Sequence, residues 1–296
     1  MSAGRLLDLS TAELGELTST LRDQALLRFA SGAGQLRAVS VVDGRVRPHR
    51  MGSSASVVHQ VRALRLALSA RDRTAVASSA DALDDLLIPT GHRPLVVVPT
   101  AELVDMPWSA LPSRRGRPVS VAPSVRHWLR ASATGLAFDR ALWVAGPGLR
   151  HAGREVRALR GRHGGVALHG PESTVDAVLT AMAGADIAHI AAHGTVRPCP
   201  SLCLADGPLR GHDLARAHRT PSVVVLSACD SGLAPALLRR GTRTVLASVR
   251  AVPDEQVLDL MAAVHVALRA GTPPATALAQ AQRLHGDLGF SCFGAG

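Results

Sequence analysis

The side chains best suited to chemistry in this sequence are histidines and cysteines in its second half. The stretch HIAAHGTVRPCPSLC carries His189 and His193 four residues apart, followed by Cys199 and Cys203 four residues apart. Another cysteine, Cys229, ends the apolar run SVVVLSAC. These residue types serve two chemistries: zinc coordination, and attack by a thiol that an imidazole activates. The choice between them depends on whether the histidine stretch is a helix or a strand.

The second half of the chain alternates short apolar runs with segments of helical spacing. The apolar runs, most of them closed by Gly or Pro, are PLVVVP, ALWVAGP, GVALHG, ADIAHIAAHG, SVVVLSACDSG and TVLASVRAV. The helical segments are GREVRALRGRHG, STVDAVLTAMAG and GHDLARAHR, and then two C-terminal helices broken at Gly271 and Pro273-Pro274. Such alternation predicts an α/β fold whose mainly parallel sheet is covered by helices on both faces.

The first third of the chain differs in pattern. A helical segment is followed by alternating apolar and polar residues around Asp43-Gly44, which predicts a β-hairpin. Two helices are expected next, over residues 56–70 and 73–87. No segment has the composition of a linker, so we expect one α/β domain after an N-terminal helical extension.

A strand conformation of ADIAHIAAH argues against a shared metal site. At ~3.3 Å per residue, His189 and His193 would stand about 13 Å apart, too far to bind one ion. The spacing of the two cysteines after them also differs from that of zinc fingers. We therefore expect no metal and no cofactor, and we interpret Cys199 and Cys203 as small apolar side chains that fill space in a loop and a short strand.

The strand placement leaves a second chemistry. His193 would end one strand directly before Gly194, and Cys229 would end the next parallel strand. Sites in open α/β sheets form beyond the carboxyl ends of the strands. An imidazole near a thiol raises its thiolate fraction and can later protonate a leaving amine. The pair therefore predicts a cysteine nucleophile with a histidine base.

Composition narrows the setting. The net charge is +10, and all 33 basic residues are arginine. The absence of lysine is typical of the coding bias of a GC-rich bacterial genome. The arginines are scattered and aromatic residues are few, which disfavours nucleic-acid binding. No apolar run approaches the roughly 18 residues that indicate a membrane span, and no signal peptide is evident. Four cysteines without a secretion signal indicate reduced thiols, so we expect a cytoplasmic protein.

Several of these motifs, in order along the chain, resemble the CHAT-domain family of caspase-like cysteine peptidases. They are RPLVVVPTAELVDMPWSALPSRRGRPVSVAPSV, HIAAHG, VVVLSACDSG, TVLASVRAVPDEQ and the C-terminal GFSCFGAG. The resemblance extends from about residue 25 to residue 296. It implies a caspase-like fold with an N-terminal β-hairpin, a CHAT domain over 25–296 and a helical extension over 1–24.

The resemblance also implies roles for individual residues. His193 would be the general base and acid, and Cys229 the nucleophile. The backbone N–H groups of Gly194 and Cys229 would form the oxyanion hole. A substrate would add as a strand beside the residues Ser248, Val249, Arg250 and Ala251. A basic substrate residue could be selected by one of the carboxylates Asp206, Asp213 and Asp230.

Other positions match the family or depart from it. His189 lies in the family motif as a structural rather than catalytic residue, and Trp108 and Ser124 match family positions as packing and turn residues. After the nucleophile motif only LAPALLRR and Gly241 stand where the family has a longer, helix-bearing segment. Arg250 replaces a Trp that is common in the family, which changes the side chains that could pack there.

Three functions follow for comparison. The first is a caspase-like cysteine endopeptidase that acts on a protein or peptide substrate and is controlled by a separately encoded activator or recruiting protein. The second is a catalytically silent CHAT-fold binding or scaffold module, which the shortened segment favours. The third, a nucleic-acid-associated factor, rests on net charge alone.

Overall fold

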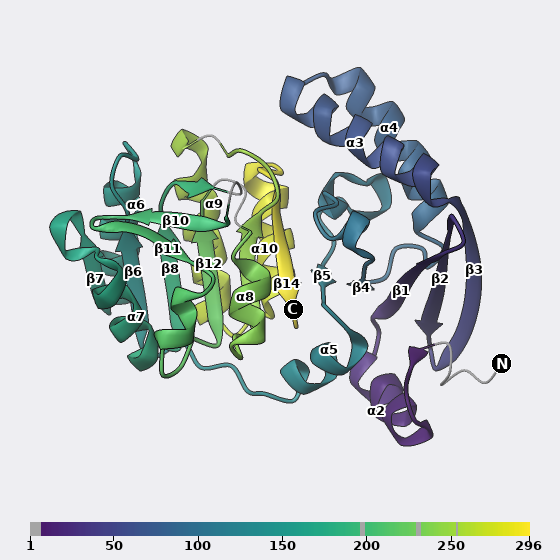
Figure 1. The fold of residues 1–296 in the computed structure, drawn as a ribbon, viewed down its shortest axis with the longest axis horizontal. Coiled ribbons are helices and arrows are strands. Elements are labelled where there is room, and N and C mark those ends of the chain that lie inside the picture. Colours follow the sequence, from purple (N-terminus) through teal and green to yellow (C-terminus); the bar gives the residue numbers. More distant parts are fainter. Residues whose placement is uncertain (1–6, 196–198, 229–231, 253) are drawn as a thin grey trace. The chain divides into compact units, whose positions relative to one another are not determined.

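The computed structural model describes residues 7–195, 199–228, 232–252 and 254–296. The chain divides into two compact units, one reaching to Ala133 and the other running from Thr134 to Gly294. A boundary at Ala133 was not expected, because the segment around it lacks the composition of a linker. The elements of both units are labelled in Figure 1.

The first unit contains a five-stranded sheet of order β3-β2-β1-β4-β5. Strands β1, β2 and β3 are antiparallel neighbours, whereas β4 runs parallel to both β1 and β5. The strands are β1 (Ala25–Gly32), β2 (Gln35–Val42), β3 (Arg45–Ser53), β4 (Leu95–Val98) and β5 (Val119–Val121).

Two-residue turns join the three antiparallel strands. The predicted hairpin at Asp43-Gly44 is confirmed, with φ of 49° and 71° at the two positions. A second such turn, Ala33-Gly34, has φ of 51° and 73°. Positive φ at both central residues gives a turn whose twist matches that of the strands. The second turn has no sequence signal, because Ala rarely adopts positive φ.

Four α-helices of at least eight residues accompany this sheet within residues 7–133, and the two predicted after the hairpin are confirmed. The helices are α2 (Thr11–Leu21), α3 (Ser54–Ala70), α4 (Arg73–Leu87) and α5 (Val125–Ser132). Helix α2 begins with a capping box in which Ser10 and Glu13 exchange hydrogen bonds, and Ser124 caps α5 by accepting from the N–H of His127. Trp108 is buried against Phe29, so its interpretation as a packing residue is confirmed.

The second unit contains a six-stranded sheet of order β14-β13-β12-β8-β6-β7. All neighbours are parallel except β14, which runs antiparallel to β13. The strands are β6 (Ala141–Ala145), β7 (Val166–His169), β8 (Ile187–Ala191), β12 (Val223–Ser227), β13 (Thr244–Ser248) and β14 (Phe290–Gly294). The predicted mainly parallel sheet is therefore confirmed.

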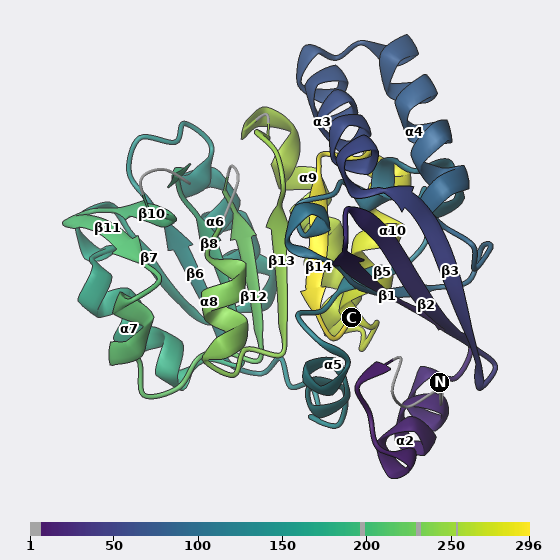
Figure 2. The same ribbon diagram turned by 45° about the vertical axis from the view of Figure 1, so that its right-hand side comes forward.

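Helices cover both faces of this second sheet (Figures 1 and 2). One face packs against α6 (Ala152–His163), α9 (Asp254–Arg269) and α10 (Pro274–His285), whose apolar side chains join alternate strand residues in one core. The other face carries α7 (Val175–Gly184) and α8 (Ala234–Arg239). The helix expected in GHDLARAHR is only a four-residue 3-10 turn, Asp213–Arg216. The carboxylate of Asp213 accepts a hydrogen bond from the backbone N–H of Arg210. Such a local bond favours a turn over a longer helix.

A small three-stranded sheet lies in the connection between β8 and β12. It consists of β9 (Gly194–Thr195), β10 (Ser201–Leu204) and β11 (Gly207–Arg210), in the order β11-β10-β9. No described helix is long and apolar enough to cross a bilayer.

Candidate active site

Three neighbouring parallel strands of the second unit end at the same level. Ala145 of β6 pairs with Ala191 of β8, which pairs with Ser227 of β12. His193 follows Ala191 by two residues, and Cys229 follows Ser227 by two. Cys229 and Asp230 lie outside the described residues. Each predicted catalytic position therefore follows its strand by two residues, counted from the paired residues Ala191 and Ser227.

The imidazole of His193 is exposed just beyond the end of β8. A Cβ built on Gly148, in the turn after β6, would lie 3.4 Å from both Cδ2 and Nε2 of His193. The same turn is tied to β8, because the N–H of Gly146 donates to the carbonyl of Ala191 at 2.8 Å. The glycine turn after β6 therefore forms a close wall for the histidine ring.

The N–H of Gly194 faces away from the small sheet. The N–H of Cys203 donates to the carbonyl of His193 at 2.9 Å, while Gly194 pairs with Leu202. In an antiparallel ladder this pattern makes Gly194 and Leu202 a pair without mutual hydrogen bonds. The N–H of Gly194 is thus directed away from β10, next to the histidine, as an oxyanion donor requires.

Of the two interpretations made for the residues around His193, that of the cysteines is wrong and that of the histidine strand is confirmed. Cys199 and Cys203 are both exposed, so the expectation that they fill space as apolar side chains is wrong. Cys203 does lie on a short strand, but its side chain is exposed while its neighbours Leu202 and Leu204 are buried. His189 and His193 lie along a strand and its continuation, as expected. Among the described side chains, no three His, Cys, Asp or Glu are grouped as metal ligands.

The strand end expected to bind substrate is hydrogen-bonded onto itself. The hydroxyl of Ser248 donates to the carbonyl of Arg250 at 2.7 Å and accepts from the N–H of Arg250 at 3.2 Å. The N–H of Val249 donates to the carbonyl of Gly289, and the guanidinium of Arg250 donates to the carbonyl of Asp287. The Arg250 side chain lies across Gly289, where a Cβ would come within 2.4 Å of it.

The two described carboxylates proposed for substrate selection have local partners. Asp206 is exposed and accepts from the N–H of Val175, the first residue of α7, at 2.8 Å. Asp213 accepts from the N–H of Arg210 at 2.8 Å and lies 3.7 Å from the guanidinium of Arg216. Both carboxylates therefore stabilise loops of this connection.

The segment after the nucleophile motif keeps a helix despite its length. Helix α8 has six residues with a proline in its first turn, and it packs beside β13. Gly211 lies close to this helix, since a Cβ there would stand 3.3 Å from that of Ala236. The shortened segment is thus an ordered part of the second unit.

A buried polar cluster lies within the sheet just below the strand ends. His189 is fully buried, and its Nδ1 lies 3.1 Å from Nε2 of His265 on α9. Its Nε2 lies 3.1 Å from Oε1 of Glu155 on α6, although the angles there are not those of a hydrogen bond. Ser227 donates to the other oxygen of Glu155 at 3.3 Å. The structural interpretation of His189 is confirmed, and its partners were missed.

Burial controls the charge of His265 in this cluster. The pKa of His265 is held well below its ordinary value, first by burial and then by the neighbouring His189 and His163. Trp143 packs edge-on against His265 with ring centroids 4.9 Å apart. His265 is therefore neutral at neutral pH. Glu155 and His265 are distant from His189 in the sequence, on α6 and α9. The one sequence signal that could have indicated their burial is the apolar face of each helix.

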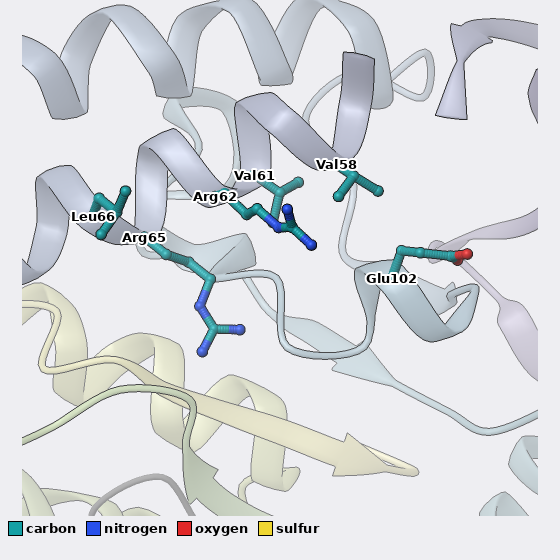
Figure 3. A pocket seen from close by; sticks show the side chains of 6 residues that line it. All are labelled: Val58, Val61, Arg62, Arg65, Leu66 and Glu102. Carbon is teal, nitrogen blue, oxygen red and sulfur yellow. The ribbon is translucent and has the colours of Figure 1, made fainter. Parts of the chain in front are cut away.

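A hollow of about 510 Å³ lies in the first unit beside α3 (Figure 3). The apolar Leu66 is 71% exposed at its edge, and the arginines of α3 project into it. Its lining residues are Val58, Val61, Arg62, Arg65, Leu66 and Glu102. None of the predicted catalytic or substrate-binding residues lines it.

Solved structures share this fold. Two structures of the separase–securin complex of Saccharomyces cerevisiae match with TM-scores of 0.72 and 0.68, at 8% and 9% sequence identity. The matches cover 96% of this chain but only 30% and 31% of the other chains, so this chain spans less than a third of their length. At this identity the similarity defines a class of fold, the caspase-like α/β fold, and nothing more.

The sequence comparison narrows the class to a family. The sequence model of the CHAT domain matches residues 74–285, which is most of the chain. The chain therefore belongs to the CHAT-domain family. No curated protein matches it. The matched region begins within α4, so the expected domain start at residue 25 stays a prediction.

Proposed function

We propose that this CHAT domain is a cysteine endopeptidase whose His193 and Cys229 form a catalytic dyad. The observation that carries the proposal is the pairing of Ala191 with Ser227, which gives both residues the same offset from one level of the sheet. Adjacent parallel strands lie about 4.8 Å apart, a separation that an imidazole and a thiol can bridge. The family assignment and the separase-like fold support the same chemistry.

The reaction follows from the positions of these groups. His193 takes the proton of the Cys229 thiol, and the thiolate attacks the carbonyl carbon of the scissile peptide bond. The N–H groups of Gly194 and Cys229 stabilise the tetrahedral oxyanion. His193 then protonates the leaving amine as the bond breaks. Water, deprotonated by His193, hydrolyses the acyl-enzyme and restores the thiol.

Substrate binding uses the chain that follows β13. An extended peptide would pair with Ser248, Val249, Arg250 and Ala251 by adding a strand. The backbone of Arg250 already exchanges hydrogen bonds with the Ser248 hydroxyl, so a bound peptide has to replace those bonds. Selection of a basic substrate residue by Asp206, Asp213 or Asp230 belongs to the proposal. The local partners of Asp206 and Asp213 make Asp230 the preferred candidate.

Control by a partner protein is the second part of the proposal. The matching separase structures hold that protein in a complex with securin. In this chain, the hollow beside α3 places the exposed Leu66 next to Arg62 and Arg65 (Figure 3). An exposed apolar side chain flanked by cations suits a partner segment with an apolar anchor between carboxylates.

The experiment is cleavage of a mixed peptide library by the purified protein, alone and with the products of neighbouring genes added. We expect cleavage by the wild type and its loss, by at least about 10³-fold, in both Cys229→Ala and His193→Ala. Alanine variants of Asp206, Asp213 and Asp230 show which carboxylate sets the preference at the cleaved bond. Unchanged preference in all three variants would reject carboxylate selection.

The alternative is a catalytically silent binding module of the same fold. The hydrogen bonds that the strand end at Arg250 makes with itself favour this alternative, since they limit access for a peptide. The shortened segment that holds α8 favours it because a shorter segment leaves the substrate pocket open or different from that of the family. Absence of cleavage by the wild type under every partner condition would support this alternative and reject the peptidase.

A further inference from the structure

One buried carboxylate, that of Glu155, contacts both strands that lead to the two catalytic positions. Glu155 is 3% exposed and extends from α6 toward the sheet. One of its oxygens accepts from Ser227 on β12, and the other lies 3.1 Å from His189 on β8. Ser227 precedes Cys229 by two residues, and His189 precedes His193 by four. Glu155 therefore contacts both strands that precede the catalytic positions, β8 at its middle residue and β12 at its last residue.

The contacts define a consistent direction of hydrogen bonding. The carboxylate of Glu155 accepts from Ser227 through one oxygen, and its other oxygen is buried opposite His189 without a completed hydrogen bond. If His189 carries its proton on Nε2, opposite that oxygen, its Nδ1 is an acceptor for the Nε2–H of His265. Neutral His265 supplies that donor. The cluster thus runs from α9 through β8 to Glu155 and on to β12.

The surrounding residues exclude simpler explanations of this cluster. Apolar side chains of the core enclose it, including Trp143 and Ala191, so solvent does not satisfy it. The described histidines and Glu155 are not grouped as metal ligands. A polar cluster in an apolar core costs stability unless its geometry is fixed, and fixed geometry is what the strand ends require.

From these contacts we infer that Glu155 is a positioning residue, which holds the ends of β8 and β12 through His189 and Ser227 and thereby aligns His193 with Cys229. The inference rests on the proposed function, since it concerns the same dyad. Glu155 does not touch the substrate. It acts on the turnover step rather than on binding, because misalignment of about 1 Å between reacting groups slows chemistry by up to about 10²-fold.

The test compares Glu155→Gln and Ser227→Ala with the wild type in the full chain. Ser291→Ala is the matched control, because Ser291 is also a strand serine of the second unit with the same 8% exposure as Ser227. Two quantities are measured: kcat and KM for a library-derived peptide, and the rate of Cys229 alkylation by iodoacetamide, resolved by peptide mass spectrometry. The exposed Cys199 and Cys203 serve as internal reference thiols.

We expect Glu155→Gln to lower both kcat and the Cys229 alkylation rate about tenfold, with KM unchanged. Ser227→Ala should lower both by a smaller factor, and Ser291→Ala should change neither. A folded Glu155→Gln with wild-type kcat and alkylation rate, or with a raised KM alone, overturns the inference. Should Glu155→Gln fail to fold, Ser227→Ala decides by the same criteria.

The two readouts separate this inference from the proposed function. If the wild type cleaves no peptide, the peptidase proposal fails, while the alkylation rate of Cys229 relative to Cys199 and Cys203 still tests the alignment. If the wild type cleaves and Glu155→Gln and Ser227→Ala behave as the wild type does, the dyad is retained and the positioning role of Glu155 is rejected.

Discussion

Each unit of this protein buries charged or polar side chains, but the two clusters are completed differently. In the first unit Arg114 is fully buried and donates to Ser113 and to the carbonyls of Gly91 and Arg93. Ser113 in turn donates to Asp84 through both its N–H and its hydroxyl. In the second unit His189 and Glu155 face each other without completing a hydrogen bond.

The difference separates a structural cluster from one near chemistry. Two donors of Arg114 go to backbone carbonyls of one loop, those of Gly91 and Arg93, so the main effect of the Arg114 cluster is to fix that loop. The Glu155 cluster links two strands and two helices at the level where the predicted catalytic positions begin. Buried polar groups without a partner occur in both units, so it is the link to both strands, rather than the missing hydrogen bond alone, that distinguishes the Glu155 cluster.

The largest effect on stability is expected at Arg114. Burial lowers its pKa to about 10, so it is still charged at neutral pH. Arg114→Met leaves the carbonyls of Gly91 and Arg93 without their donor and should lower the free energy of unfolding by about 3 kcal/mol. Urea denaturation measures the loss, and hydrogen exchange with mass spectrometry should locate it in the first unit.

The control for this prediction is an arginine at the surface. Arg93 forms an ion pair with Asp43 in which both side chains are substantially exposed. Arg93→Met should cost about 0.5 kcal/mol, as exposed pairs do. Equal losses in the two variants would show that burial does not distinguish the Arg114 cluster.

A pH-dependent effect is expected in the second unit. The pKa of His265 is lowered on folding, so the unfolded chain binds a proton more readily below about pH 6.5. Stability from this group is fully present above that pH and is lost as the pH falls. His265→Gln keeps a donor for His189 but does not titrate. It should reduce the slope of unfolding free energy between pH 6.5 and 5 by up to about 1.4 kcal/mol per pH unit.

Other groups define the range of that measurement. Asp186, whose pKa is lowered to about 2 by its hydrogen bond with Arg140, stays ionised throughout it. His163 and His127 also have lowered pKa values through burial and keep part of the slope in both proteins. Identical slopes for wild type and His265→Gln would mean that His265 takes up its proton in the folded state.

The smallest effect is expected at the surface of the second unit. Asp206→Ala removes the acceptor for the first N–H of α7 and should cost about 1 kcal/mol. Glu172→Ala removes an acidic side chain from the preceding turn without breaking that bond. Thermal unfolding of the two variants compares them, and a loss no larger than in Glu172→Ala would show that the capping bond contributes nothing measurable.

Local patterns in the sequence predicted the fold well. The apolar runs became strands and most segments of helical spacing became helices, because burial on both faces leaves a continuous apolar run and burial on one face leaves a stripe. The exception is GHDLARAHR, which forms only a short 3-10 turn. The turn at Asp43-Gly44 was predicted from residues that favour positive φ. The turn at Ala33-Gly34 was not, since its first residue does not.

Contacts between distant segments could not be read from local pattern. The carboxyl-edge placement of His193 was expected from its strand, whereas the contacts of His189 depend on how α6 and α9 pack on the sheet. Exposure of Cys203 depends on how the small three-stranded sheet that contains β10 packs on the rest of the unit, which the local sequence does not encode. The local partners of Asp206 and Asp213 likewise come from the folded connection rather than from sequence spacing.

The two tight turns of the N-terminal meander have a consequence for the order of folding. Strands β1, β2 and β3 lie within residues 25–53, and their pairings with one another cross only two-residue turns. Contacts this close in sequence form quickly, on the order of 1–10 μs for a hairpin, because little chain entropy is lost in closing them. On the ribosome, this meander can therefore acquire structure before any strand of the second unit has been synthesised, and the parallel strands β4 and β5 are then added to an edge that already exists.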